Sequence, residues 1–186
     1  MCGTSWIPLG MVKVSSPEES SPLDVLLGNV HACLDGGMYY AALVVALTIP
    51  EICAALEAEG GRGNSERYKK WYRDYLADLY PYLTDDDCYS LRCSVLHQGK
   101  LGRPGMQYSR VLFTVPNAEN NVFHNNVWND ALNLDVVLFC NDVSEAAKRW
   151  YAAKHDDPHV VANLPNLVRY RPTGLSPYMV GMPLIA

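Results

Sequence analysis

The sequence predicts a mainly α-helical bundle with a small inserted β-hairpin and an irregular Pro-rich C-terminal tail. Apolar residues recur at helical spacing in four segments before Gly99 and in one segment after Asn133. Between these segments the apolar period shortens to two, which is typical of strands. Five of the 12 prolines follow residue 157, where they disfavour regular helix.

This pattern divides the 186 residues into three parts. We expect residues 1–21, which are rich in Pro, Gly and Ser, to be a flexible N-terminal lead-in. Residues 22–156 are expected to form the bundle, with the hairpin inserted at about 108–129. Residues 157–186 are too apolar for a free segment, so we expect this tail to pack on the bundle or on a partner subunit.

The first two helices are expected at residues 22–34 and 38–59, with two glycines at 36–37 between them. The second is apolar on nearly all sides, which predicts the central, buried helix of the bundle. Pro50 is expected to kink or restart it, with Thr48 as the cap of a restarted helix.

The third helix is expected to start at Ser65 and to reach Tyr82 at most. Aromatic and basic residues alternate along it, namely Tyr68, Trp71, Tyr72 and Tyr75 with Arg67, Lys69, Lys70 and Arg73. Basic residues among aromatics can stack bases and hold phosphates. The same pattern fits a buried aromatic stripe beside a solvated basic face.

The fourth helix, expected at residues 85–98, has both ends marked. Thr84 and three aspartates favour its start, because their oxygens accept free backbone N–H groups and their charge suits the helix dipole. Gly99 favours its end, because glycine adopts a left-handed C-terminal cap without strain. Arg92 and His97 lie five residues apart on this helix, within reach of one ligand. A permanent cation beside a titratable imidazole suits phosphodiester chemistry.

The segment Arg92-Cys93-Ser94-Val95-Leu96-His97 resembles the R-x4-6-H motif of the HEPN superfamily, small helical-bundle domains that include many metal-independent ribonucleases. The resemblance implies an antiparallel HEPN-like bundle in a homodimer, where two such motifs face each other and form a composite RNA-cleaving site. It implies that His97 activates the ribose 2′-OH or protonates the leaving oxygen, and that Arg92 stabilises charge on the phosphate. Phage defence or a toxin system is the implied setting, with an antitoxin or regulatory protein as a further partner.

Four more residues are expected to contact the substrate of such a site. Ser94 lies within the motif, and Lys100 and Arg103 follow it in a loop that extends a local positive patch. Glu51, beside the expected kink, suits either this site or the first turn of a restarted helix. No metal and no other cofactor is expected, because the attacking hydroxyl belongs to the RNA.

The alternative hypothesis is a non-catalytic HEPN-like module that binds a nucleotide or another protein and dimerises through the same helices. Cys93, which stands where many active members have Asn, Asp or His, favours this alternative. So does the net charge of −5, which gives no overall attraction to nucleic acid. Arg92 would then pair with Glu51 or with one of residues 85–87.

After the motif, residues 111–115 alternate as in a strand, residues 116–120 resemble a turn, and residues 122–128 are expected to return as the second strand. His124 and its asparagine neighbours suit either a polar pocket or a turn. A last long helix is expected at residues 133–154.

The six cysteines have no zinc-binding spacing, and several lie in apolar stretches, so we expect them to be buried and reduced. The N-terminal residues lack the pattern of a signal peptide. The most apolar run, residues 39–49, is about half the length that spans a bilayer. These features predict a cytoplasmic protein without a membrane partner.

Overall fold

The computed structural model describes residues 21–186 except residues 103 and 120, and this part is mainly helical, as the sequence predicts. The predicted lead-in therefore lies outside the described residues, apart from Ser21. The helices are α1 (Pro22–Asp35), α2 (Tyr39–Leu56), α3 (Ser65–Tyr75), α4 (Asp85–Gln98), α5 (Val136–Lys154) and α6 (Pro158–Asn163), with short 3-10 turns η1 (Glu59–Gly61), η2 (Ala77–Leu79) and η3 (Leu164–Asn166).

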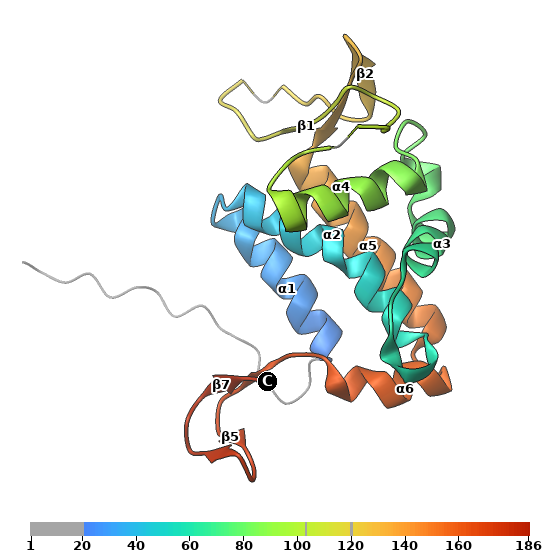
Figure 1. Cartoon of the computed structure of the whole chain (residues 1–186). Helices are drawn as coiled ribbons and strands as arrows, with labels where there is room; N and C mark the ends of the chain where they lie inside the picture. The colour runs from blue at the N-terminus through green and yellow to red at the C-terminus, as the bar shows by residue number, and fades with distance from the viewer. Residues whose placement is uncertain (1–20, 103, 120) are drawn as a thin grey trace, which may run out of the picture.

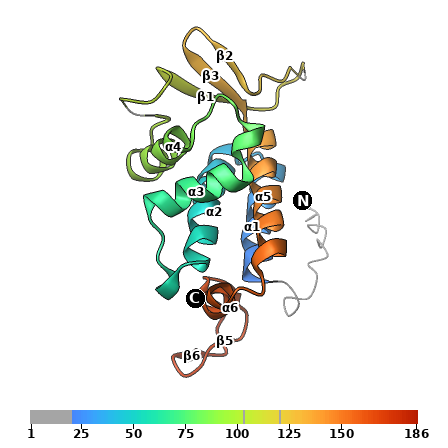
Figure 2. The ribbon, with the colours of Figure 1, turned by 90° about the vertical axis from the view of Figure 1, so that its right-hand side faces the viewer.

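Helix α2 is central, because α1, α3, α4 and α5 all pack against it (Figures 1 and 2). Nine of its residues are buried, which agrees with its apolar composition. Pro50 lies inside the helix, and the restart that the sequence predicts does not occur. Thr48 is not a cap, because its hydroxyl donates back to the carbonyl of Val45 at 2.7 Å.

By length and composition, α2 is the one helix in the described part of the chain that could cross a membrane, and half of it is buried. The central helix of a bundle has the same composition. The absence of a membrane partner and the cytoplasmic location therefore stay predictions.

The predicted ends of α4 are confirmed. Thr84 accepts the backbone N–H of Asp87 at 3.0 Å, and this hydrogen bond satisfies one donor of the first turn. Gly99 has a φ of 63°, and the N–H of Lys100 donates to the carbonyl of Ser94 at 3.2 Å. The motif helix is thus fixed at both termini by its own local sequence.

The sequence allowed helix α3 to extend as far as Tyr82. It ends at Tyr75, and a 3-10 turn follows. Tyr68, Trp71 and Tyr72 are buried, so the aromatic stripe belongs to the core. The Tyr72 hydroxyl donates to the carbonyl of Leu83 at 2.6 Å, which joins α3 to the segment before α4.

The predicted hairpin is wrong in its pairing. Strands β1 (Arg110–Thr114), β2 (Asn126–Trp128) and β3 (Ala131–Asp135) form one sheet in the order β1-β3-β2. β1 is parallel to β3, and the hairpin joins β2 to β3. Asn129 and Asp130 connect them with φ angles of 50° and 58°, the left-handed conformation that a tight hairpin turn needs.

The last long helix therefore begins at Val136 rather than at residue 133. Asp135 ends β3 and caps α5, because its carboxylate accepts the N–H groups of Val137 and Leu138 at 2.9 Å. His124 Nδ1 accepts the N–H of Asp135 at 3.1 Å. The polar cluster around His124 thus holds the sheet to the start of α5.

The tail is more ordered than the sequence predicts. α6 is a regular helix with Pro158 in its first turn, where the missing N–H has no cost. It packs on the bundle through Val160, which is buried. The Asn163 side chain donates to the carbonyls of Leu56 and Ala58 at 3.0 and 2.9 Å, which satisfies the open end of α2.

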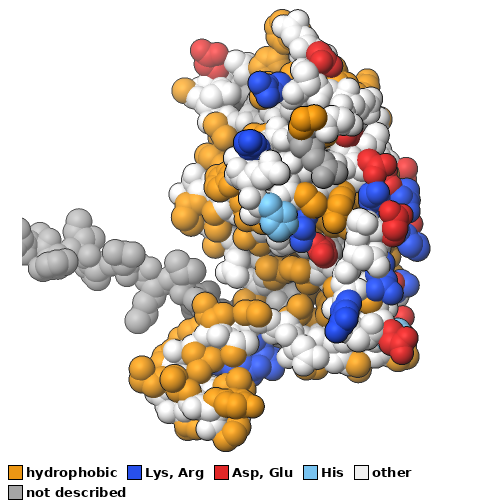
Figure 3. All heavy atoms as spheres, in the orientation of Figure 1, with side chains coloured by type: hydrophobic (Ala, Val, Ile, Leu, Met, Phe, Trp, Pro, Cys, Tyr) orange, Lys and Arg blue, Asp and Glu red, His pale blue; other side chains and the backbone are white. Residues whose placement is uncertain are grey.

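Residues 168–186, called the C-terminal arm below, do not pack on the bundle as α6 does. Two antiparallel pairs form it: β4 (Tyr170–Arg171) with β7 (Leu184–Ile185), and β5 (Gly174–Leu175) with β6 (Met179–Val180). The arm extends below the helices in Figure 1, and Figure 3 shows it as a lobe rich in hydrophobic side chains.

Candidate functional site

Two of the predicted site residues meet between α2 and α4. The guanidinium of Arg92, on α4, forms an ion pair with the carboxylate of Glu51, on α2. Their side chains are 17% and 28% exposed, so the pair is partly shielded from water yet reachable from the surface. Glu51 therefore contacts the motif helix, and it does not cap a restarted helix.

The hydrogen-bonding capacity of this site is incompletely used. The Nε of Arg92 and the hydroxyl of Ser94 are buried and have no hydrogen-bond partner in the described part of the chain. A buried donor without a partner is unfavourable by about 1–3 kcal/mol. Arg92 Nη1 contacts only the Cys93 sulfur, at 3.9 Å, which is a weak acceptor.

Ser94 is 1% exposed and lies inside the bundle, which argues against the predicted contact with a substrate. His97 and Lys100, by contrast, are exposed at the end of α4. The His97 imidazole makes no hydrogen bond or ion pair to any described residue, so its ring is open to solvent or to another molecule. Arg103 lies outside the described residues.

Three of the four basic residues of α3 are paired with carboxylates, so they do not form an open positive face. Lys69 lies 2.7 Å from Asp86 and 3.4 Å from Glu66, Lys70 pairs with Asp74, and Arg73 pairs with Asp85. Figure 3 shows acidic and basic side chains interspersed along that edge of the molecule. This compensation of charge leaves the motif site without a strong electrostatic attraction for RNA from α3.

The Cys88 thiol near this site is protected by the core, whereas Cys93, beside Arg92, is half-buried. Cys88 is buried on α4, and burial raises the pKa of its thiol to about 12. Tyr68, whose hydroxyl lies 3.4 Å from the Cys88 sulfur, also has a pKa raised by burial. In the described residues no three His, Cys, Asp or Glu side chains gather where a metal ion could bind.

Sequence reasoning missed a second polar cluster. It lies in a hollow between α2, α3 and α5, and Glu57, Trp71 and Lys154 are among the residues that line it. The interleaved aromatic and basic residues of α3 were the sequence signal that could have indicated this cluster. Glu57 and Lys154 carried no such signal, because each belongs to a helix whose pattern indicates only packing.

Comparison with known proteins identifies no relative: no family model, curated protein or solved structure gives a significant match to the chain. The HEPN resemblance therefore rests on the motif residues themselves.

Proposed function

We propose that this chain is a metal-independent endoribonuclease with an HEPN-like bundle, acting as a homodimer. The observation that carries the proposal is the placement of the two motif side chains on α4: Arg92 lies at the rim of the core, 17% exposed, and His97 is exposed in the last turn of the helix. Glu51, on α2, holds the guanidinium of Arg92, on α4, at the rim of the core. Such an arrangement fixes a phosphate-binding group before the substrate arrives.

The proposed chemistry is transfer of the phosphoryl group to the neighbouring ribose oxygen. A neutral His97 takes the proton of the 2′-OH, the 2′ oxygen forms a bond to phosphorus, and the bond from phosphorus to the 5′ oxygen breaks. A protonated imidazole donates its proton to that 5′ oxygen. The products are a 2′,3′-cyclic phosphate and a 5′-hydroxyl. Arg92 stabilises the negative charge that develops on the phosphoryl oxygens.

A second copy of the chain supplies the second imidazole. General base and general acid act on the same phosphodiester, and the motif of one chain carries one histidine. Two copies that place their α4 ends together would provide His97 twice, once neutral and once protonated. Glu51 acts as a positioning residue, because its carboxylate holds the guanidinium and reaches no reacting atom.

The test is cleavage of labelled single-stranded RNA and transfer RNA in EDTA by the purified full-length chain. We expect cleavage that ends in cyclic phosphate and is lost in Arg92→Ala and in His97→Ala. His159→Ala, which changes another exposed histidine on α6, is the matched control and should cleave normally. Unchanged cleavage by Arg92→Ala, or intact RNA with a folded dimeric parent, contradicts the proposal.

The non-catalytic module is the second candidate, and the same ion pair supports it. Glu51 neutralises the charge of Arg92, and a carboxylate beside the guanidinium repels a phosphate. In this candidate the pair serves only to join α2 to α4, and the module binds a nucleotide or another protein without cleaving RNA.

The double substitution Glu51→Leu with Arg92→Met separates the two candidates. Replacing a partly buried ion pair by apolar residues of similar size preserves many folds. A ribonuclease would lose cleavage while the dimer persists. A binding module would show no RNA cleavage in either protein, and its dimerisation would be equal in the parent and the double variant.

A further inference from the structure

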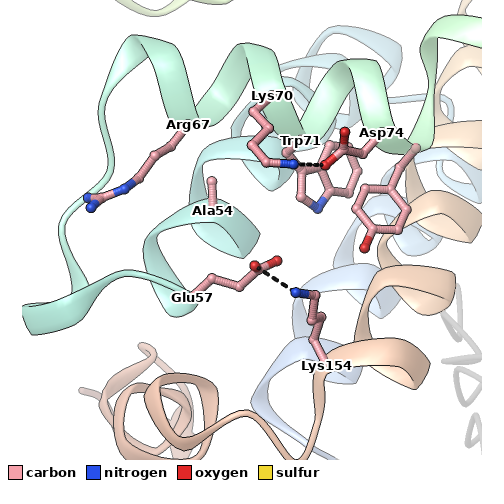
Figure 4. Close-up of a pocket in the computed structure, with 8 residues that line it drawn as sticks. Ala54, Glu57, Arg67, Lys70, Trp71, Asp74 and Lys154 are labelled. Atoms are coloured by element: carbon pink, nitrogen blue, oxygen red, sulfur yellow. Dashed lines mark hydrogen bonds and ion pairs between the residues drawn. The ribbon is translucent and has the colours of Figure 1, made fainter.

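The hollow between α2, α3 and α5 has an accessible volume of about 230 Å³ and gathers charged side chains from all three helices. Arg67 and Lys70 come from α3, Glu57 caps the end of α2, and Lys154 comes from α5. In Figure 4 Lys70, Glu57 and Lys154 lie around one space, and the Arg67 guanidinium at its edge points away from Trp71. The five charged residues, which include Asp74, are three cations and two carboxylates, a net charge of +1 in a chain of net charge −5. The hollow is therefore a local exception to the acidic character of the protein.

Both carboxylates of the hollow already have partners. Glu57 accepts a hydrogen bond from the indole N–H of Trp150 and pairs with Lys154 at 3.2 Å. This pairing raises the pKa of Lys154, so its ammonium stays charged at neutral pH. Asp74 pairs with Lys70. The Arg67 guanidinium donates to the backbone carbonyl of Arg62, at 2.7 Å, and makes no ion pair with a described carboxylate.

One donor in the wall of the hollow lacks a partner. Trp71 is 3% exposed, and its indole N–H makes no hydrogen bond to any residue that the structure describes. In Figure 4 the indole nitrogen points from α3 toward the space between Glu57 and Lys154. An indole N–H donates and never accepts, so only an acceptor can satisfy it.

From these observations we propose that the hollow binds a small ligand through an oxyanion group, a carboxylate or a phosphate, which accepts from the Trp71 indole N–H and faces Lys154, with the positive charge of Arg67 at the edge of the hollow. A monoanion balances the net charge of the cluster. The volume is below that of pockets for drug-sized ligands, so the ligand is small. Lys70 is 69% exposed and can move aside to admit it. This site lies apart from the Arg92 motif and does not depend on the proposed cleavage.

The test is titration of the full-length chain, labelled with ¹⁵N-tryptophan, with inorganic phosphate and separately with benzoate. We expect a saturable shift of the Trp71 indole signal, assigned by its loss in Trp71→Phe. The signal of Trp128, which is exposed on β2, is the internal control and should not shift. Saturation by phosphate alone or by benzoate alone identifies which oxyanion the site prefers.

Matched variants test the contacts. Arg67→Gln removes a cation without leaving a carboxylate unpaired, and Trp71→Phe removes the N–H while keeping an aromatic ring. Calorimetry with the preferred anion should show binding weakened about tenfold in Trp71→Phe, the usual worth of a hydrogen bond to a charged group, and by a smaller factor in Arg67→Gln, which removes a nearby charge. Lys148→Gln, which changes an exposed cation elsewhere on α5, should bind as the parent does. No saturable shift with either anion, or equal binding by all variants, overturns the proposal.

Discussion

The guanidinium of Arg92 and the carboxylate of Glu51 depend on each other at the residue scale. Each is partly shielded from water, so loss of one leaves the other charge without its partner. The sequence offered Glu51 as one of several pairing partners for Arg92. Which of these carboxylates pairs with Arg92 could not be predicted from the sequence, because it depends on how α2 and α4 pack and not on local spacing.

We predict that Arg92→Ala lowers the free energy of unfolding by about 1–3 kcal/mol, because it strands the Glu51 carboxylate in a partly desolvated position. Chemical denaturation followed by circular dichroism measures this. Arg73→Ala removes a more exposed ion pair and should cost less than about 1 kcal/mol. Equal losses in the two variants would show that the Glu51 pair has no special dependence on Arg92.

We also predict that Cys88 resists alkylation in the folded protein. Its pKa of about 12 means that the reactive thiolate is rare at pH 8, and it should become common only as the pH approaches 12. Cys140, whose pKa burial likewise raises to about 12, should behave in the same way. Iodoacetamide labelling at pH 8, with and without denaturant, followed by peptide mass spectrometry, measures both. Rapid labelling of native Cys88 would contradict the burial of α4 against the core.

At the scale of elements, the helix ends were readable because caps are local. Thr84 and Gly99 act on groups within a few residues of themselves, so the sequence alone located both ends of α4. The strand pairing of the sheet could not be predicted in the same way. The parallel pairing of β1 with β3 joins residues that lie far apart in the chain, and the turn at Asn129 and Asp130 was interpreted as part of an asparagine-rich cluster.

We predict opposite effects for the same substitution at two glycines. Gly99→Ala should destabilise the protein by about 1 kcal/mol, because a left-handed φ of 63° strains a side chain. Gly28→Ala should stabilise it by about 0.5–1 kcal/mol, because Gly28 is exposed inside α1 with open space around its Cβ position. Thermal and chemical denaturation of the two variants measure the difference. A loss at Gly28 would show that α1 packs more tightly there than its exposure indicates.

At the scale of the whole molecule, one core extends from Leu23 on α1 to Val160 on α6. The sequence predicted its helical part because α2 is apolar on nearly all sides and burial on α3 leaves a periodic aromatic stripe. The role of α6 was missed, because the prolines of the tail were taken to exclude any regular helix. Pro158 begins α6, and the side chain of Asn163, at the end of α6, donates to the Leu56 carbonyl at the end of α2. This part of the tail therefore forms a regular helix that docks on the bundle.

Truncation should therefore distinguish the contribution of the core to stability from that of the C-terminal arm. Removal of residues 168–186 takes away strands that pair with one another and side chains such as Tyr178, which is 85% exposed. We expect the free energy of unfolding to change by less than about 1 kcal/mol, and self-association to decrease because an exposed apolar surface is lost.

Removal of residues 158–186 also takes away α6. It exposes the apolar surface under Val160 and leaves the Leu56 and Ala58 carbonyls without Asn163, so we expect a loss of about 2–5 kcal/mol. Urea unfolding followed by the fluorescence of the buried Trp71 and Trp150 compares the two truncations with the full chain. If removal of residues 168–186 already unfolds the bundle, the arm is part of the core. If removal of residues 158–186 leaves the free energy of unfolding unchanged, α6 does not contribute to the stability of the bundle.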